Sequence, residues 1–338
     1  MSKKILLGII GAGRIAKVHA KSIYFNIPNA EVKMIADPYL SEEAKIWAAE
    51  LGISSTSLDY TEILNDHEID AVLICSSTNT HAKITREAAL AGKHIFCEKP
   101  IDLDENEIVK TLQAVADAGV QLQVGFNRRF DHNYRALRDA VINKQIGDLH
   151  IVNITSRDPG PPPIEYVKVS GGLFMDMTIH DFDMVRFLAG CEVKNVFASG
   201  AVLVDKEIGK AGDIDTAIIT MEMESGAIAV INNSRSAAYG YDQRAEVFGS
   251  KGAAATENDT SNTSVLSTAD GITGQKPLNF FLDRYVQAFA DEMTSFTTAL
   301  VNNTPVPVTG RDGLIPVLIA KAALKSLKSG KKEPVNFL

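Results

Sequence analysis

The feature that most constrains this chain is a glycine-rich hexapeptide that follows an apolar run and precedes a helical pattern. Residues 11–16 read Gly-Ala-Gly-Arg-Ile-Ala, directly after the apolar run Ile5–Ile10. Gly11 permits a tight turn, Gly13 lets the backbone approach a pyrophosphate, and Ala16 allows close packing of the helix on the strand. The N–H groups at the start of such a helix attract phosphate oxygens. The pattern in this position therefore predicts dinucleotide contacts from Gly11, Ala12, Gly13, Arg14 and Ile15.

Strand and helix patterns alternate through the first ~125 residues. The predicted strands cover 5–10, 31–36, 71–75, 94–97 and 121–124, and the predicted helices cover 14–26, 41–51, 60–64, 83–91 and 105–118. Ser41 is a candidate N-cap. Repeated β-α-β-α order implies a parallel, doubly wound sheet of the Rossmann type. We therefore expect an α/β fold whose first domain, residues 1–124, binds the dinucleotide.

The second part of the chain has longer strand patterns. After a helical pattern over 133–144, strands are predicted at 149–156, 194–204, 214–223, 226–236 and 243–248, and helices at 281–301 and 313–328. The alternation and glycine of Met221–Gly226 indicate a hairpin. The proline cluster at 160–163 predicts an irregular loop, and 252–275 predicts weak strands joined by loops. We expect a second α/β domain, residues 125–338, with a large, mostly antiparallel open sheet.

The composition excludes several function classes. The net charge is −8, and 45% of the residues are hydrophobic, as in ordinary globular proteins. An acidic balance argues against a general role on nucleic acid or a membrane surface. The first apolar run is too short for a signal peptide, so we expect a cytoplasmic protein. The three cysteines form no C-x-x-C pair, and we interpret Cys75 and Cys97 as buried thiols, with no metal site.

Asp37 ends the second predicted strand. A carboxylate there can accept hydrogen bonds from the adenosine ribose hydroxyls, and it would repel the 2′-phosphate of NADP. NAD is therefore the expected cofactor. The alternative is that Asp37 and Pro38 simply form a turn.

Two further polar segments follow predicted strands, where loops line the ligand crevice of an open parallel sheet. After 71–75 come Ser76, Ser77, Asn79 and His81, which suit ribose and phosphate contacts, although Thr80 or His81 could equally cap the next helix. After 94–97 come Glu98 and Lys99, then Pro100. We expect cofactor contacts from this pair, and the Lys99 ammonium could stabilise a developing alkoxide. Lys99 could also be an ordinary surface residue before a turn.

A second cluster of chemically capable residues lies at 171–183. If this segment is helical, Asp176 and His180 share a face, and Asp183 extends it. Histidine is the usual general base near neutral pH, and a carboxylate one turn away can orient it. The alternative is a structural Asp–His pair. The same spacing occurs in metal sites, but the sequence holds no further histidine or cysteine cluster to complete one.

The motifs at Gly11–Ala16, Glu98–Pro100 and Asp176–His180 together resemble the glucose–fructose oxidoreductase / inositol dehydrogenase / rhizopine catabolism family over essentially the whole chain. Four segments resemble the inositol 2-dehydrogenases in particular, namely 125–131, 171–174, 178–183 and 239–243. The resemblance implies a Rossmann domain joined to an α/β domain whose open sheet often pairs subunits. We therefore expect a homo-oligomer, a dimer or tetramer.

The resemblance also implies roles for individual residues. Lys99 would bridge the nicotinamide ribose and the substrate, His180 would take the hydroxyl proton, and Asp176 would bind a substrate hydroxyl. Further residues would line the polyol pocket, namely Asn127, Arg128, Asp158, Asp183, Tyr239 and Tyr241. Many bacterial myo-inositol enzymes carry Met where Asn127 stands and Asn where Asp158 stands, which leaves the stereoisomer open.

These observations predict NAD-dependent oxidation of a cyclic polyol, most simply myo- or scyllo-inositol, to the 2-keto compound. A hexose dehydrogenase of the same family and an NAD-dependent glycoside hydrolase are the alternatives. A non-catalytic dinucleotide sensor is a third, and the presence of both Lys99 and His180 counts against it.

Overall fold

A computed structural model of the chain describes residues 4–337. Contacts divide the chain into two compact units. Unit 1 holds the residues up to Phe130 together with Val286–Val317, and unit 2 holds Asp131–Tyr285 together with the residues from Leu318 onward. The predicted domain boundary between residues 124 and 125 stays a prediction, because these units are defined by contacts and not as domains. The later segment 286–317, however, belongs by its contacts to unit 1.

Unit 1 is built on a six-stranded sheet in the order β3-β2-β1-β4-β5-β6, and every neighbouring pair is parallel. The strands are β1 Ile5–Ile10, β2 Ala30–Ala36, β3 Ser55–Ser57, β4 Ala71–Ile74, β5 His94–Cys97 and β6 Leu122–Val124. The expected Rossmann sheet is confirmed. Its strand order reverses between β1 and β4, so the loops after these strands diverge at the point where such sheets bind ligands.

The helices of unit 1 connect these strands. They are α1 Arg14–Asn26, α2 Glu42–Glu50, α3 Thr61–Asn65, α4 Thr78–Leu90 and α5 Glu105–Ala118, with the 3-10 helix η1 Asn127–Phe130 and α12 Val286–Asn302. Ser41 caps α2 as predicted, since its side chain accepts a hydrogen bond from the Ala44 amide. The predicted start of a helix at Lys83 is wrong, since α4 begins at Thr78. The first turn was missed because its residues are polar and resemble a loop.

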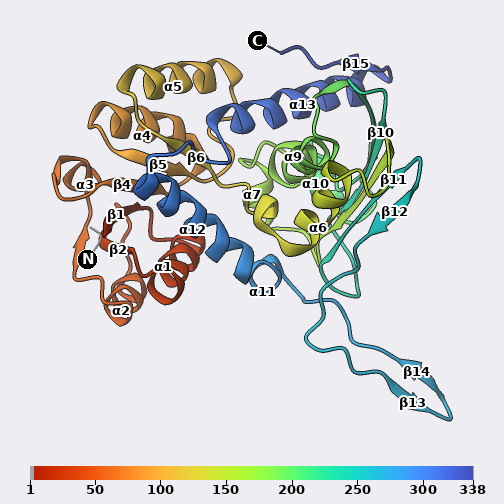
Figure 1. Cartoon of the computed structure of the whole chain (residues 1–338), viewed down its shortest axis with the longest axis horizontal. Helices are drawn as coiled ribbons and strands as arrows, with labels where there is room; N and C mark the ends of the chain where they lie inside the picture. Colours follow the sequence, from red (N-terminus) through yellow and green to blue (C-terminus); the bar gives the residue numbers. More distant parts are fainter. Residues whose placement is uncertain (1–3, 338) are drawn as a thin grey trace. The chain divides into compact units, whose positions relative to one another are not determined.

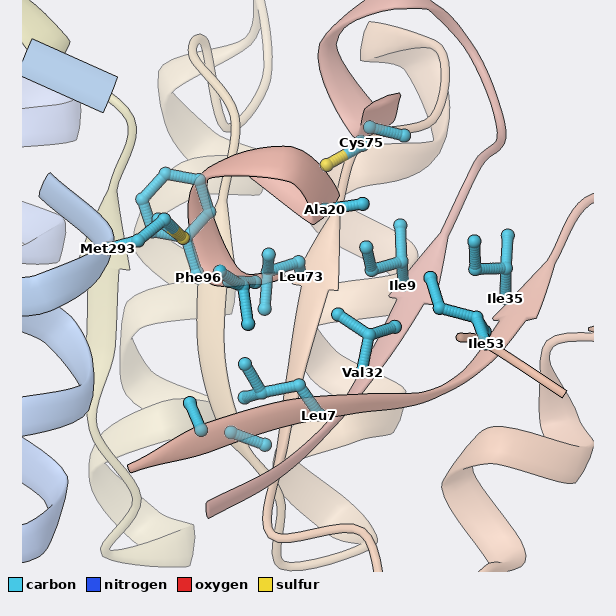
Figure 2. Close-up of a cluster of buried hydrophobic side chains, with 14 of the residues drawn as sticks. Leu7, Ile9, Ala20, Val32, Ile35, Ile53, Leu73, Cys75, Phe96 and Met293 are labelled. Atoms are coloured by element: carbon cyan, nitrogen blue, oxygen red, sulfur yellow. The ribbon is translucent and has the colours of Figure 1, made fainter. Parts of the chain in front are cut away.

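The core of unit 1 joins segments far apart in the sequence. Leu7, Ile9 and Phe96 of the sheet share one buried cluster with Met293 and other residues of α12. Figure 2 shows Met293 beside Phe96, with the aliphatic side chains of β1, β2 and β4 extending from them. The apolar face of α12 is therefore buried against the sheet that carries the glycine-rich loop.

Unit 2 is built on a seven-stranded sheet in the order β12-β11-β7-β10-β9-β8-β15. The strands are β7 Leu149–Arg157, β8 Val193–Ala201, β9 Thr216–Met223, β10 Ile228–Ser234, β11 Asp242–Gly249, β12 Gly252–Ala255 and β15 Glu333–Pro334. Only β7 and β10 pair in parallel. The mostly antiparallel sheet and the β9–β10 hairpin are both confirmed, and Gly226 supplies the positive φ of that turn.

The helices of unit 2 are α6 His132–Ile142, α7 Ile164–Val167, α8 Leu173–Asp176, α9 Thr178–Ala189, α10 Lys206–Lys210 and α11 Phe281–Arg284, together with the C-terminal part of α13 Gly310–Ser329. Helix α9 packs on β7 and β10, with α6 against α9 (Figure 1). A hairpin of β13 Leu266–Thr268 and β14 Gly271–Thr273 lies in the segment expected to hold weak strands.

Two predicted helices are interrupted. The shared face of Asp176 and His180 was predicted on the condition that 171–183 is helical, and Met177 separates α8 from α9 there. The segment 281–301 is likewise divided at Tyr285 into α11 and α12. Residue patterns show which positions are apolar, and a break of one residue between two helices leaves that pattern unchanged. Within residues 4–337, no helix is both long and apolar enough to cross a membrane.

Candidate active site

The glycine-rich loop of unit 1 has the geometry of a phosphate site. Gly11 has φ +95°, and a Cβ atom there would lie 2.7 Å from the backbone of Cys75, so only glycine fits. At Gly13 a Cβ would meet no atom within 4 Å, so this side of the loop faces open space. Gly13 is the N-cap of α1, and no side chain caps the helix. The first N–H groups of α1 can therefore receive phosphate oxygens, as the sequence predicted.

Asp37, the residue after β2, holds the glycine-rich loop by a direct hydrogen bond. Its Oδ2 accepts a hydrogen bond of 2.7 Å from the Ala12 amide, and its Oδ1 accepts one of 2.7 Å from the Tyr39 amide. The prediction concerned only ribose contacts, and the loop anchor is a function that it missed. A carboxylate has about four lone-pair sites, so two backbone bonds leave acceptors for a ribose hydroxyl.

The segment after β4 places polar groups beside the same loop. Ser77 and Asn79 are exposed at the start of α4, and no side chain caps this helix. The Thr80 hydroxyl donates its single proton to the Ser77 carbonyl at 2.7 Å. In its 2.6 Å contact with Ser76 it therefore accepts, and the Ser76 hydroxyl donates. The alternative in which Thr80 or His81 caps the helix is therefore wrong.

His81 is buried and anchors two loops. Its Nδ1 lies 2.8 Å from the Pro100 carbonyl oxygen, and its Nε2 lies 3.0 Å from the Ser76 carbonyl oxygen. Both ring nitrogens are thus engaged by the protein backbone. The expected cofactor contact of His81 stays a prediction, and its observed contacts connect the loop after β4 to the loop after β5.

The segment after β5 carries Glu98 and Lys99. The Glu98 amide donates to the Ile74 carbonyl at 3.0 Å, and the Gly125 amide donates to the Cys97 carbonyl at 2.9 Å, so the segment is held from both neighbouring strands. The Lys99–Pro100 peptide bond is cis, and Lys99 is half-buried. The loops after β1, β4 and β5 therefore bring the predicted cofactor residues together at one edge of the sheet of unit 1.

Two of the predicted acidic residues of unit 2 lie beside a buried arginine that was not predicted from the sequence. Arg235 Nη2 lies 3.1 Å from Asp176 Oδ2, and Arg235 Nη1 lies 3.9 Å from Asp158 Oδ2. The Tyr166 hydroxyl donates to the other oxygen of Asp176 at 2.9 Å. Asp158 and Asp176 were predicted separately, and Arg235 brings them together. An arginine next to an alternating strand was the only sequence signal for it.

His180 lies in the first turn of α9, half-buried, and the buried acids beside it anchor this helix. Asn233 of β10 donates to Asp181 at 2.8 Å and accepts a hydrogen bond of 2.7 Å from Thr178. Asp183 is fully buried, with Arg186 Nη1 3.5 Å from its Oδ1. Helix α8 ends at Asp176 and α9 begins at Thr178, so Asp176 and His180 lie on two successive helices on either side of Met177.

The two predicted tyrosines occupy different environments in unit 2. Tyr239 donates to Asp242 and accepts from Arg157 Nη1 at 2.9 Å. Burial alone would raise the pKa of Asp242, but hydrogen bonds from Arg244, Tyr239 and Asn258 lower it below its usual value. Asp242 therefore stays ionised and fixes the Tyr239 hydroxyl. Tyr241 is buried edge-on against Tyr285, with ring centroids 6.1 Å apart.

The remaining two predicted substrate residues, Asn127 and Arg128, are buried in η1 of unit 1, whereas the other six belong to unit 2.

Within residues 4–337, no group of three or more His, Cys, Asp or Glu side chains could hold a metal ion. Cys75 and Cys97 are buried thiols as interpreted from the sequence, and burial raises the pKa of Cys97 to about 12.

Comparisons with known proteins match both parts of the chain. Residues 5–126 match a family model described as an oxidoreductase family with an NAD-binding Rossmann fold. Residues 134–255 match the GFO/IDH/MocA C-terminal domain. Each match falls largely within one structural unit.

Individual relatives match nearly end to end. An uncharacterized oxidoreductase of Bacillus subtilis, YrbE, is 51% identical, with 98% of this chain and 96% of the relative covered. A myo-inositol 2-dehydrogenase of Thermotoga maritima is 46% identical, with 95% and 96% covered. The structure of a scyllo-inositol dehydrogenase from Lactobacillus casei with bound NAD(H) and scyllo-inositol has a TM-score of 0.91 and 32% identity, with 98% and 99% covered.

Proposed function

This chain belongs to the GFO/IDH/MocA family of NAD-binding oxidoreductases, and from that premise we infer that it oxidises an inositol to the 2-keto compound with NAD. The observation that carries the inference is the 46% identity to a myo-inositol 2-dehydrogenase over almost the full length of both chains. We expect myo-inositol as the first substrate, because the scyllo-inositol 2-dehydrogenase of Bacillus subtilis is only 34% identical.

The NAD site rests on the geometry of unit 1. Gly11 and Gly13 give the backbone access to the pyrophosphate, and the uncapped start of α1 supplies N–H donors. The Asp37 carboxylate, fixed by two backbone amides, accepts from ribose hydroxyls and repels a 2′-phosphate. When bound, NAD accepts the hydride that leaves the carbinol carbon.

The remaining chemistry is assigned to three side chains. His180 accepts the proton of the reacting hydroxyl as its carbon loses the hydride. The Lys99 ammonium stabilises the negative charge that develops on that oxygen. Asp176, held by Tyr166 and Arg235, accepts a hydrogen bond from a neighbouring hydroxyl of the polyol. Asn127, Arg128, Asp158, Asp183, Tyr239 and Tyr241 complete the polyol site in this proposal.

The oligomeric state is a second part of the proposal. In the sheet of unit 2, apolar side chains alternate between the face under α9 and the opposite face. Register places Phe197, Ile218, Ile228 and Phe248 on that opposite face, and all four are exposed. An apolar face of this kind is buried in most stable proteins, and a second copy of the chain provides a matching surface. We also propose a cytoplasmic location, where NAD is available.

The function is tested by following NADH absorbance with purified protein, NAD and a panel of myo-inositol, scyllo-inositol, chiro-inositol, glucose and galactose. We expect NADH formation with an inositol and much slower turnover with NADP. Lys99→Ala and His180→Ala should each lower kcat by about 100-fold, whereas His132→Ala, at an exposed histidine of α6, should not change it. NAD binding without NADH formation from any polyol would favour the glycoside hydrolase or the sensor.

A further inference from the structure

A histidine buried in the dinucleotide helix contacts the segment that carries Lys99. His19 lies in the second turn of α1 and is fully buried. Its Nε2 lies 2.7 Å from Glu98 Oε1. The rings of Phe96 and Phe289 stand edge-on to the imidazole, with centroids at 5.0 and 5.6 Å. The ring therefore has one polar partner and is otherwise fixed by packing.

Two further titratable groups, Glu292 and Cys75, are buried in the part of unit 1 that holds this pair. Glu292 of α12 is fully buried, and neither of its carboxyl oxygens has a hydrogen-bond partner among the described residues. Burial, and then the charge of Glu98, raises the pKa of Glu292 well above its usual value. Burial and the Glu98 charge likewise keep Cys75 a thiol. A carboxylate oxygen only accepts, so in this pair the N–H is that of His19 Nε2 and it donates to Glu98 Oε1.

Glu98 is also confined on its other side. A Cβ atom at Gly125 would lie 3.0 Å from Glu98 Oε2, so a larger residue there would press on this carboxylate. One residue further along, the Pro100 carbonyl is bound by the buried ring of His81. Lys99 therefore lies between two anchors, and each of them is a buried histidine on a helix that begins at the predicted cofactor site.

We propose that His19 is a positioning residue: its hydrogen bond to Glu98 fixes the turn at Glu98–Pro100 and so directs the Lys99 ammonium toward the reacting oxygen. The inference rests on the proposed role of Lys99 in polyol oxidation. A misplacement of about 1 Å at a catalytic group can lower a rate by about 100-fold. Loss of this bond therefore acts on kcat, while the glycine-rich loop that holds the dinucleotide stays intact.

Three variants test the proposal. His19→Leu removes the donor at similar volume, and His19→Gln keeps an N–H donor. His94→Leu is the matched control, because His94 lies at the opposite end of the same strand, β5, and accepts a hydrogen bond from the Gln121 amide. Each variant is measured for the Kd of NADH, for kcat per NADH-binding site, and for amide hydrogen exchange of the peptide spanning 97–101.

We expect His19→Leu to lower kcat per site by about 10-fold or more and to speed exchange in 97–101, with the Kd of NADH changed by less than about 3-fold. His19→Gln should recover most of the loss, and His94→Leu should match the wild type. Equal kcat in His19→Leu and wild type, or an equal loss in His94→Leu, would overturn the proposal. If the wild type oxidises no polyol, the proposed function fails. The positioning role of His19 is then judged by hydrogen exchange alone, and unchanged exchange at 97–101 in His19→Leu would overturn it. Should His19→Leu not fold, His19→Met, which also lacks an N–H donor, carries the same expectations.

Discussion

The buried carboxyl of Glu292 makes the stability of unit 1 depend on pH. Its pKa is raised well above the usual 4.5, first by burial and then by the charge of Glu98. Below pH 4.5 the folded and unfolded chains both hold this proton. As the pH rises above 4.5, the unfolded chain releases it and the folded chain retains it, so the free energy of unfolding falls by up to about 1.4 kcal/mol per pH unit until the folded pKa is reached.

Glu292→Gln replaces the neutral acid with a side chain of the same shape that does not titrate. We expect the variant to have a higher melting temperature than the wild type at pH 8, and the difference to shrink toward pH 4.5. Thermal unfolding between pH 4.5 and 8 checks this, with Glu62→Gln, at an exposed position of α3, as the control. A constant difference at every pH would mean that Glu292 ionises normally in the folded chain.

Individual residues also show what a sequence reveals of a site. Gly11 and Lys99 were predictable because a backbone turn and a strand end require their residue types at fixed places in the chain. His19 and Arg235 were not, because each acts through a partner that folding brings close: Glu98 is 79 residues from His19, and Asp176 is 59 residues from Arg235 by their numbers. Their isolated positions in the sequence carried no pairing information.

Among the elements, long and strongly patterned segments were predicted best. Strand β1 and helices α1 and α5 have the predicted bounds, because a continuous apolar run or a periodic apolar pattern specifies them locally. Short elements were missed: β3 is the tripeptide Ser-Thr-Ser, and α10 spans Lys206–Lys210. Both are too short to show a period, and pairing with β2 makes Ser55–Ser57 a strand.

Helix α12 provides a test at the scale of an element. Its pattern predicted a helix, but not that its apolar face completes the core of unit 1. Met293 is fully buried in the cluster that contains Trp47, the single tryptophan of the chain. Met293→Ala should therefore lower the free energy of unfolding of unit 1 by about 2–5 kcal/mol.

Urea denaturation followed by Trp47 fluorescence measures this effect, because that signal originates in unit 1. Val301→Ala is the control, since Val301 lies on the same helix with its side chain exposed. We expect a change of less than about 0.5 kcal/mol there. Equal effects of the two variants would show that α12 contributes only helix propensity and not its packed face.

For the whole molecule, both sheets and their types were predictable from the sequence, but the way the chain divides between the two units was not. Periodicity shows that a helix has an apolar face, and it does not say which sheet covers that face. In the sequence, the segment 286–317 comes after every strand of the second sheet except β15. It nevertheless packs with unit 1. A contact between such distant segments is decided by tertiary packing.

The exposed face of the unit 2 sheet governs assembly in our proposal. Ile218 lies on the exposed face of β9, opposite Asn232 of β10 and Ser199 of β8, so a charge there would lie within the proposed contact. We expect the wild type to have a mass at least twice 36.5 kDa by light scattering at micromolar concentration, and Ile218→Asp to lower it toward that of one chain. Leu90→Asp, at an exposed leucine on α4 of unit 1, should leave the mass unchanged. A wild type that stays at 36.5 kDa across this range would refute the assembly, and it would leave the apolar face to a different partner.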